Sequence, residues 1–155
     1  EDANAAGIKT HVFRPFSGYG LDQGDTYPFP AIIRRVKDHK GGPFEVWGDP
    51  ESTRDWVHIS DVVNCVMAHI DANVLGPVNI CTGRATPFHE LATLALAANG
   101  LKDIEVVGKK DAPMGVMHRV GDPKRMQEVY IPRIALEDAI TEATVSLKRH
   151  RGKRT

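Results

Sequence analysis

The residue types that most often carry out chemistry are present in this sequence, but not at the spacings that catalysis needs. The seven histidines are scattered, and none stands at metal-ligand spacing from another histidine, a cysteine or a carboxylate. We interpret His58, in a β-rich run, and His89, on a predicted helix, as structural. Gly41-Gly42 lacks the spacing of a dinucleotide or P-loop phosphate site, and no Gly-x-Ser-x-Gly sequence marks a nucleophile. The chain alone therefore predicts no catalytic centre and no metal site.

Several stretches nevertheless differ from the pattern of an ordinary small domain. Residues 14–20 read Arg-Pro-Phe-Ser-Gly-Tyr-Gly directly after a predicted strand. Residues 44–49 read Phe-Glu-Val-Trp-Gly-Asp, and after a short turn residues 53–63 read Thr-Arg-Asp-Trp-Val-His-Ile-Ser-Asp-Val-Val. Residues 119–125 read Arg-Val-Gly-Asp-Pro-Lys-Arg, and residues 130–140 read Tyr-Ile-Pro-Arg-Ile-Ala-Leu-Glu-Asp-Ala-Ile.

These stretches resemble signatures of the extended short-chain dehydrogenases/reductases, in particular the NAD-dependent epimerases and dehydratases of nucleotide-diphosphate sugars. The family patterns are Arg-Pro-x-Asn-x-Tyr-Gly after a sheet strand, Arg-Asp-Phe/Tyr-x-x-Val-x-Asp at a helix start, and a late Arg, Asp-x-x-Lys and Gly-Trp-x-Pro. Three motifs in the right order, over residues 8–142, make the resemblance specific. It implies an α/β fold over residues 1–147: the C-terminal portion of a Rossmann-type sheet plus the small α/β substrate-binding domain.

The resemblance implies a site for a nucleotide-diphosphate sugar. Arg54 and Arg119 correspond to the family arginines that hold the substrate diphosphate. Guanidinium suits this work because its planar fork makes two parallel hydrogen bonds to phosphate oxygens and stays charged. The alternatives are a salt bridge from Arg54 to Asp55 or Glu51, and a solvated Arg119.

The same resemblance implies further substrate contacts. Val46 and Trp47 lie where the family strand brings an apolar residue to the nucleotide base, although Trp47 could instead belong to a core. Ser17 stands where the family has asparagine, and its hydroxyl can still hydrogen-bond a sugar or a phosphate. The usual Gly-Trp before the late proline is replaced by Val129-Tyr130, which makes the last part of the match weaker.

The cofactor half of the family pattern is missing from this chain. Pro15 and Phe16 correspond to the nicotinamide end of an NAD(P) site, but the Gly-rich turn and the Tyr-x-x-x-Lys pair are absent. None of the three tyrosines has lysine four residues later, and we interpret Tyr19 as a packed structural residue. Residues 1–7 resemble the tail of the helix that carries the Tyr-x-x-x-Lys pair. We therefore expect that this chain alone neither binds the cofactor nor catalyses the reaction. The other interpretation is a stand-alone, non-catalytic ligand-binding or oligomerising module.

Alternating strands and helices must position these residues. Strands are predicted at residues 10–14, 44–47, 56–59, 78–81 and 104–107. Helices are predicted at residues 31–40, from Ser60 to Ile70, from Pro87 to Gly100, and at 122–129 and 136–147. Ser60 and Thr86 are expected to cap their helices, and Val62, Val63, Val66, Met67 and Ile70 form the apolar stripe of the second helix.

Composition indicates one soluble globular domain. The chain has 155 residues, 41% hydrophobic and 26% charged, and no apolar run approaches the roughly 20 residues of a membrane span. The start is acidic and lacks methionine, which favours a piece of a longer protein without a signal peptide. Cys65 and Cys81 lie in apolar stretches, as expected for core residues in a reducing cytoplasm.

Two expectations concern partners. Residues 148–155 form a basic segment, expected to be a disordered tail, but with the rest of the chain net acidic we infer no nucleic-acid partner. No membrane association is expected. The strands at 10–14 and 78–81 resemble the last strands of a larger sheet, so we expect an exposed sheet edge and self-association into a homo-oligomer.

Overall fold

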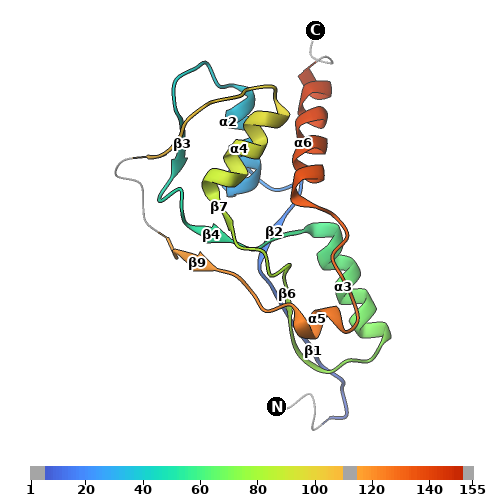
Figure 1. Ribbon diagram of the computed structural model, residues 1–155. Helices are drawn as coiled ribbons and strands as arrows, with labels where there is room; N and C mark the ends of the chain where they lie inside the picture. The colour runs from blue at the N-terminus through green and yellow to red at the C-terminus, as the bar shows by residue number, and fades with distance from the viewer. Residues whose placement is uncertain (1–5, 110–114, 152–155) are drawn as a thin grey trace.

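The computed structural model describes residues 6–109 and 115–151 (Figure 1). The strands are β1 (His11–Pro15), β2 (Ser17–Tyr19), β3 (Phe44–Trp47), β4 (Thr53–Arg54), β5 (Trp56–His58), β6 (Gly76–Ile80), β7 (Thr86–Pro87), β8 (Val106–Lys109) and β9 (His118–Arg119). The helices are α2 (Pro28–Lys37), α3 (Ile59–Asp71), α4 (Phe88–Ala98), α5 (Lys124–Gln127) and α6 (Leu136–Arg151).

The strands pair mostly in parallel, as expected for an α/β fold. Among the described residues, β1 pairs with β6, β2 with β5, and β3 with β8, all in parallel. A further small sheet has the order β7-β4-β9, in which β4 runs antiparallel to β7 and parallel to β9. Helices cross between the parallel strands, because neighbouring strands of one direction need such a connection. The predicted α/β class is confirmed.

Two hydrophobic cores lie at opposite ends of an elongated molecule (Figure 1). The larger core joins α2, α4 and α6 with the adjoining strands, and its largest fully buried side chains include Tyr19, Phe29, Ile33, Leu91 and Ile140. The smaller core lies between the β1–β6 pair, α3 and α5, with Val57, Cys65, Val78, Ile80, Met126 and Tyr130. Strands β2, β4, β5, β7 and β9 connect the two ends, and this is where the candidate site residues meet.

Helix α3 differs from its prediction in its cap and in its apolar stripe. The cap is His58, whose Nδ1 accepts the backbone N–H of Ser60 at 3.2 Å, so the prediction of a Ser60 cap is wrong. Strand β5 runs directly into the helix and brings the imidazole over the first turn. The stripe also divides: Val63 and Met67 are 54% and 52% exposed, whereas Val62 and Val66 pack against the smaller core.

Other boundaries differ by a few residues. Helix α2 begins at Pro28, because proline lacks the N–H that a first helical turn leaves unpaired. Thr86 and Pro87 form strand β7, so the expected Thr86 cap is wrong and α4 has no side-chain cap. The late helix predicted at 122–129 is shorter in the structure, where α5 covers only Lys124–Gln127. The strands β2, β4, β7 and β9 are too short for sequence periodicity to predict.

The two cysteines behave as predicted, since both are free and fully buried. Within the described ranges, no helix has the combination of length and apolarity that crossing a bilayer requires. The expected cytoplasmic location stays a prediction. Helix α6 continues to Arg151, past the expected start of the tail at residue 148, and the remaining tail residues 152–155 lie outside the described residues. So do residues 1–5, which carry most of the predicted helix remnant.

Candidate functional site

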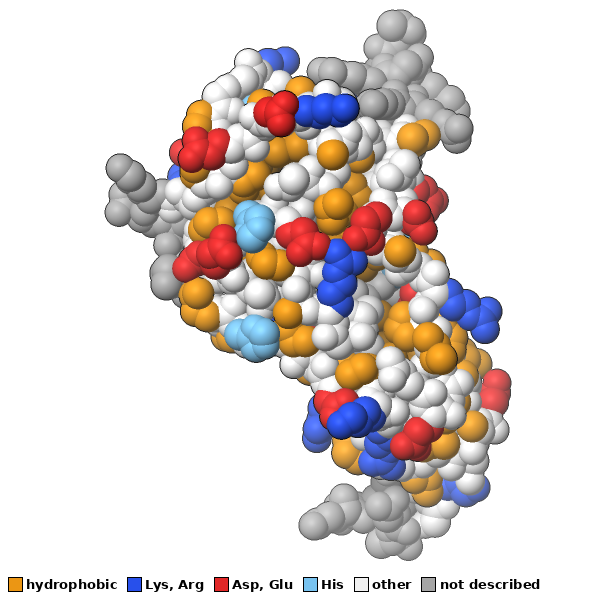
Figure 2. Space-filling view, in the orientation of Figure 1, with side chains coloured by type: hydrophobic (Ala, Val, Ile, Leu, Met, Phe, Trp, Pro, Cys, Tyr) orange, Lys and Arg blue, Asp and Glu red, His pale blue; other side chains and the backbone are white. Residues whose placement is uncertain are grey.

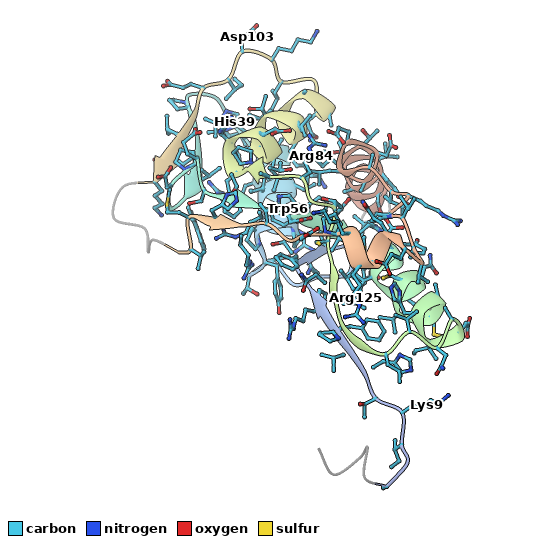
Figure 3. The ribbon with its side chains drawn as sticks, turned by 60° about the horizontal axis from the view of Figure 1, so that its bottom comes forward. Lys9, His39, Trp56, Arg84, Asp103 and Arg125 are labelled. Carbon is cyan, nitrogen blue, oxygen red and sulfur yellow. The ribbon has the colours of Figure 1, made fainter. Side chains whose placement is uncertain are left out.

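A cleft of about 150 Å³ lies where β2, β4 and β9 come together. Four of the predicted site residues line it: Phe16, Ser17, Arg54 and Arg119. The remaining lining residues are Gly18, Gln23, Tyr27, Pro28, Trp56 and Phe88. Trp56 is labelled at the centre of the molecule in Figure 3. The cleft thus combines two positive charges with hydroxyl and amide groups and several aromatic rings.

Arg54 is held at this cleft by neutral groups. Its Nη1 donates to the carbonyl oxygens of Thr53 at 2.8 Å and Val116 at 2.7 Å, and its guanidinium carbon lies 5.1 Å from the centre of the Phe88 ring. Partial burial lowers the pKa of Arg54, and the positive charge of Arg119 lowers it further. The charge of Arg54 is therefore unneutralised, since none of its described contacts is a carboxylate.

The predicted alternative partners of Arg54 are engaged elsewhere. The Asp55 carboxylate accepts hydrogen bonds from residues 82, 83 and 121. The Glu51 carboxylate lies 3.0 Å from the His89 ring. Among the described residues, neither carboxylate forms a salt bridge with Arg54.

Arg119 reaches the same cleft from a distant part of the chain. In the β4–β9 pair it is the direct register partner of Arg54, so the two side chains leave adjacent strands side by side. Its Nη2 donates to Ser17 Oγ at 3.4 Å, and the residue is otherwise exposed to solvent. The repulsion between the two guanidinium groups is what a bound anion would relieve.

Val46 and Trp47 line a second, more apolar cavity. It has a volume of about 260 Å³, and its lining includes Ala31 and Ile32 together with Arg34 and Arg35. Val46 is 1% exposed, whereas Trp47 is 68% exposed with the Lys109 ammonium 5.9 Å from its ring centre. Trp47 is therefore a surface residue. This cavity shares Pro28 and Phe88 with the arginine cleft, so the two cavities are neighbours.

The two residues predicted at the cofactor site, Pro15 and Phe16, lie in different surroundings. Pro15 is exposed at the end of β1 and is not part of the cleft lining, while Phe16 lines the cleft beside Ser17. A dinucleotide site needs glycine-rich backbone against the pyrophosphate, and this chain has no Gly-x-Gly-x-x-Gly sequence. The place of Pro15 and Phe16 at the nicotinamide end of a cofactor site stays a prediction.

Tyr19 is a structural residue, as predicted. It is 1% exposed and packs against Phe29, with 4.6 Å between ring centres, and against Trp56. Burial raises the pKa of its hydroxyl, as do the nearby carboxylates of Asp61 and Glu137. A buried phenol with a raised pKa keeps its proton and is out of reach of a ligand.

Two buried aspartates were missed from the sequence. Asp55 and Asp61 are 0% and 1% exposed, and each accepts several hydrogen bonds from distant segments. Their only sequence signal was their place in the motif of residues 53–63. Within the described ranges, no cluster of three metal-ligating side chains occurs.

A comparison with protein families shows which family the chain resembles. A model of the NAD dependent epimerase/dehydratase family matches residues 1–81. The dTDP-4-dehydro-6-deoxy-D-allose reductase of Streptomyces bikiniensis is 26% identical over 119 residues, which cover 77% of this chain and 35% of that protein. The chain therefore spans about a third of the length of this curated relative.

Solved structures of this kind share the fold. The structure of RMD from Pseudomonas aeruginosa, complexed with NADPH, has a TM-score of 0.82 at 19% identity, over 96% of this chain and 51% of that one. UDP-glucuronic acid 4-epimerase from Bacillus cereus, in complex with UDP-glucuronic acid and NAD, has a TM-score of 0.79 at 21% identity, over 96% and 48%. The fold thus corresponds to about half of each of these structures. The chain belongs to the NAD-dependent epimerase/dehydratase family.

Proposed function

We propose that this chain is the part of an NAD-dependent sugar epimerase/dehydratase that binds the nucleotide-diphosphate sugar. The observation that carries the proposal is the pair of guanidinium groups, Arg54 and Arg119, lining one cleft from adjacent strands. In that cleft a diphosphate would neutralise two like charges and accept hydrogen bonds from both forks.

The neighbouring groups extend the proposal to the rest of the ligand. Ser17 Oγ, 3.4 Å from Arg119 Nη2, would accept or donate a hydrogen bond at the phosphate or the sugar. The adjoining cavity, with buried Val46 and exposed Trp47, would take the nucleotide base, because flat bases pack well on apolar and aromatic surface.

The chain by itself would bind without turnover. Hydride transfer needs a nicotinamide beside the sugar carbon and an acid/base group within reach. Tyr19 has a buried hydroxyl, and no tyrosine of the chain precedes a lysine at the Tyr-x-x-x-Lys spacing. A stand-alone ligand-binding or oligomerising module is the second candidate, favoured only by the missing cofactor residues.

Self-association is a further part of the proposal. Strand β1 pairs only with β6 among the described strands, and parallel sheets of two strands are unusual when left uncovered. Hydrophobic side chains are visible over α3 on the face shown in Figure 2. On this helix Val63, Met67 and Ile70 are 54%, 52% and 43% exposed. A second copy covering this surface would remove it from water.

Thermal unfolding in the presence of UDP-sugars and GDP-sugars tests the binding. A ligand that binds only the folded chain raises Tm. At a ligand concentration one hundred times Kd, it raises the free energy of unfolding by about 2.7 kcal/mol. Arg54→Ala and Arg119→Ala should each strongly reduce the Tm shift, because one guanidinium holds a diphosphate more weakly than two. Arg133→Ala is the matched control, since Arg133 is exposed outside the cleft.

The outcomes separate the candidates. A Tm shift of undiminished size in both cleft variants, or no shift with any sugar nucleotide at millimolar concentration, would contradict diphosphate binding in this cleft. NAD alone should leave Tm unchanged. Because NAD also carries a diphosphate, the informative result is a shift with NAD that keeps its size in Arg54→Ala and Arg119→Ala, which would contradict our expectation that this chain alone binds no cofactor.

A further inference from the structure

Asp55 is the point at which the separate parts of the cleft are joined. Its main chain bridges two of the site residues: Asp55 N–H donates to the Arg119 carbonyl at 3.1 Å, and its carbonyl accepts from Ser17 N–H at 2.9 Å. It also directly follows Arg54 in the chain. One residue is thus bonded or linked to Ser17, Arg54 and Arg119, the three predicted polar site residues of the cleft.

The Asp55 side chain adds a second set of connections. Oδ1 accepts from the backbone N–H and the hydroxyl of Thr82, both at 2.7 Å. Oδ2 accepts from Gly83 N–H at 2.9 Å and from Gly121 N–H at 3.2 Å. The carboxylate is fully buried and ties β4 both to the loop after β6 and to the segment that follows Arg119.

The Asp55 carboxylate holds together strands whose own pairing is very short. The β4–β9 pair contains only two register partners, Thr53 with His118 and Arg54 with Arg119. A pair this short cannot by itself hold two repelling guanidinium groups in a fixed relation. The bond from Gly121 N–H to Asp55 Oδ2 fixes the chain just beyond the ladder, two residues past Arg119.

The buried charge also leaves the arginines available. Four protein donors occupy the oxygens of Asp55, and among the described residues no carboxylate forms a salt bridge with Arg54 or Arg119. An aspartate beside Arg54 in the sequence would otherwise compete with an external anion for the same guanidinium.

We propose that Asp55 is a positioning residue that sets the relation between the Arg54 and Arg119 side chains and so pre-organises the cleft for a diphosphate. This inference rests on the proposed function, because it concerns how tightly that same cleft binds. Pre-organisation matters here since small misplacements of a charged group cost much of its binding energy.

Calorimetric titration with UDP and with inorganic pyrophosphate tests it. Asp55→Asn keeps the shape of the side chain but points an amide N–H₂ at two of the four donors. We expect this variant to bind both probes about tenfold more weakly, the usual order for a lost supporting contact. The matched control is Asp61→Asn, the same change at a buried carboxylate that holds Tyr130, Arg133 and Ile134 instead.

A double-mutant cycle distinguishes positioning from general destabilisation. In an Arg119→Ala background, Asp55→Asn should cost no further affinity while it still lowers Tm. If Asp55→Asn weakens binding by the same factor in the Arg119→Ala background as in the wild type, the two residues act independently and the proposal is wrong. An affinity loss in Asp61→Asn as large as that in Asp55→Asn would also overturn the proposal. If Asp55→Asn does not fold, Thr82→Val removes one donor to the same carboxylate, and we expect roughly threefold weaker binding. Unchanged affinity in that variant would overturn the proposal.

The two proposals fail in different ways. If the wild-type chain binds neither UDP nor pyrophosphate, the proposed function is wrong before any variant is compared. If the wild-type chain binds and Asp55→Asn binds equally well, the cleft function stands and only the positioning role of Asp55 is refuted.

Discussion

Two buried tyrosines offer a paired test of how polar groups contribute to this fold. Tyr130 is 8% exposed, and its hydroxyl donates to Asp61 Oδ1 at 2.7 Å. Tyr19 is 1% exposed, and its hydroxyl has no hydrogen-bond partner among the described atoms. Replacing each with phenylalanine removes one oxygen atom from a packed ring, so the two variants differ only in what that oxygen was bonded to.

The expected free energies differ in size and in sign. A hydrogen bond to a charged group contributes about 1.5–3 kcal/mol, so Tyr130→Phe should lower the free energy of unfolding by that amount. Asp61 keeps the N–H groups of Arg133 and Ile134, which limits the loss. Tyr19→Phe removes a buried hydroxyl that gains nothing in the folded state, so stability should stay equal or rise by about 1 kcal/mol. Against a total of about 5–15 kcal/mol, the difference is measurable.

Urea unfolding at pH 7, followed by tryptophan fluorescence, measures both values, because buried Trp56 becomes exposed on unfolding. The m-values should match the wild type, which ties any change in midpoint to stability. Equal destabilisation by the two substitutions would refute the reasoning, because it would mean that the Tyr19 hydroxyl has a bonding partner.

The same Tyr130 bond has a signature at alkaline pH. Burial raises the pKa of Tyr130, and the hydrogen bond to Asp61 raises it further. A group with a raised folded pKa contributes stability that is complete below its unfolded pKa, about 10 for tyrosine, and is lost as pH rises through the folded pKa. The wild type should therefore lose more stability than Tyr130→Phe as pH rises above 10; equal slopes would contradict this bond.

Three further outcomes are expected. Burial raises the pKa of Cys65 to about 11 and that of Cys81 to about 12, so a thiol reagent at pH 8 should label neither until the chain is unfolded; fast labelling of the native chain would contradict their burial. A Cβ on Gly121 would lie 2.5 Å from Cys81 Sγ, so Gly121→Ala should cost about 1–3 kcal/mol in urea unfolding, whereas Gly18→Ala, with nothing within 4 Å, should stay within about 0.5 kcal/mol. Met67→Lys should weaken self-association in analytical ultracentrifugation, and a wild-type chain that sediments as a monomer at tens of micromolar would argue against the proposed oligomer.

Much of the fold could be predicted from local patterns. Strand β3 has the predicted bounds, because Phe44 and Val46 alternate with polar or exposed neighbours in a two-residue period. Helix α6 starts at Leu136, where apolar residues begin to repeat at helical spacing and two acidic residues favour the positive end of the helix.

The short strands could not be predicted in this way. Strands β4, β7 and β9 have two residues each, and they exist only because their partners lie beside them. A two-residue segment has no period, so its conformation depends on hydrogen bonds to residues far away in the chain. For a similar reason, the sequence could not predict that half of the apolar stripe of α3 is exposed. Periodicity indicates an apolar helix face but does not show which part of that face another element covers.

The sequence by itself determined the family motifs, the α/β class and the residue types available to the site. Only the tertiary structure decided which of them meet. Arg54 and Arg119 share a cleft because β4 and β9 pair in one register, and Trp47 points to solvent rather than into a core. Asp55 is buried because four donors from distant loops surround its carboxylate, and a charge leaves water only where such partners are brought to it. No local pattern contains that information, since the partners are adjacent only after folding.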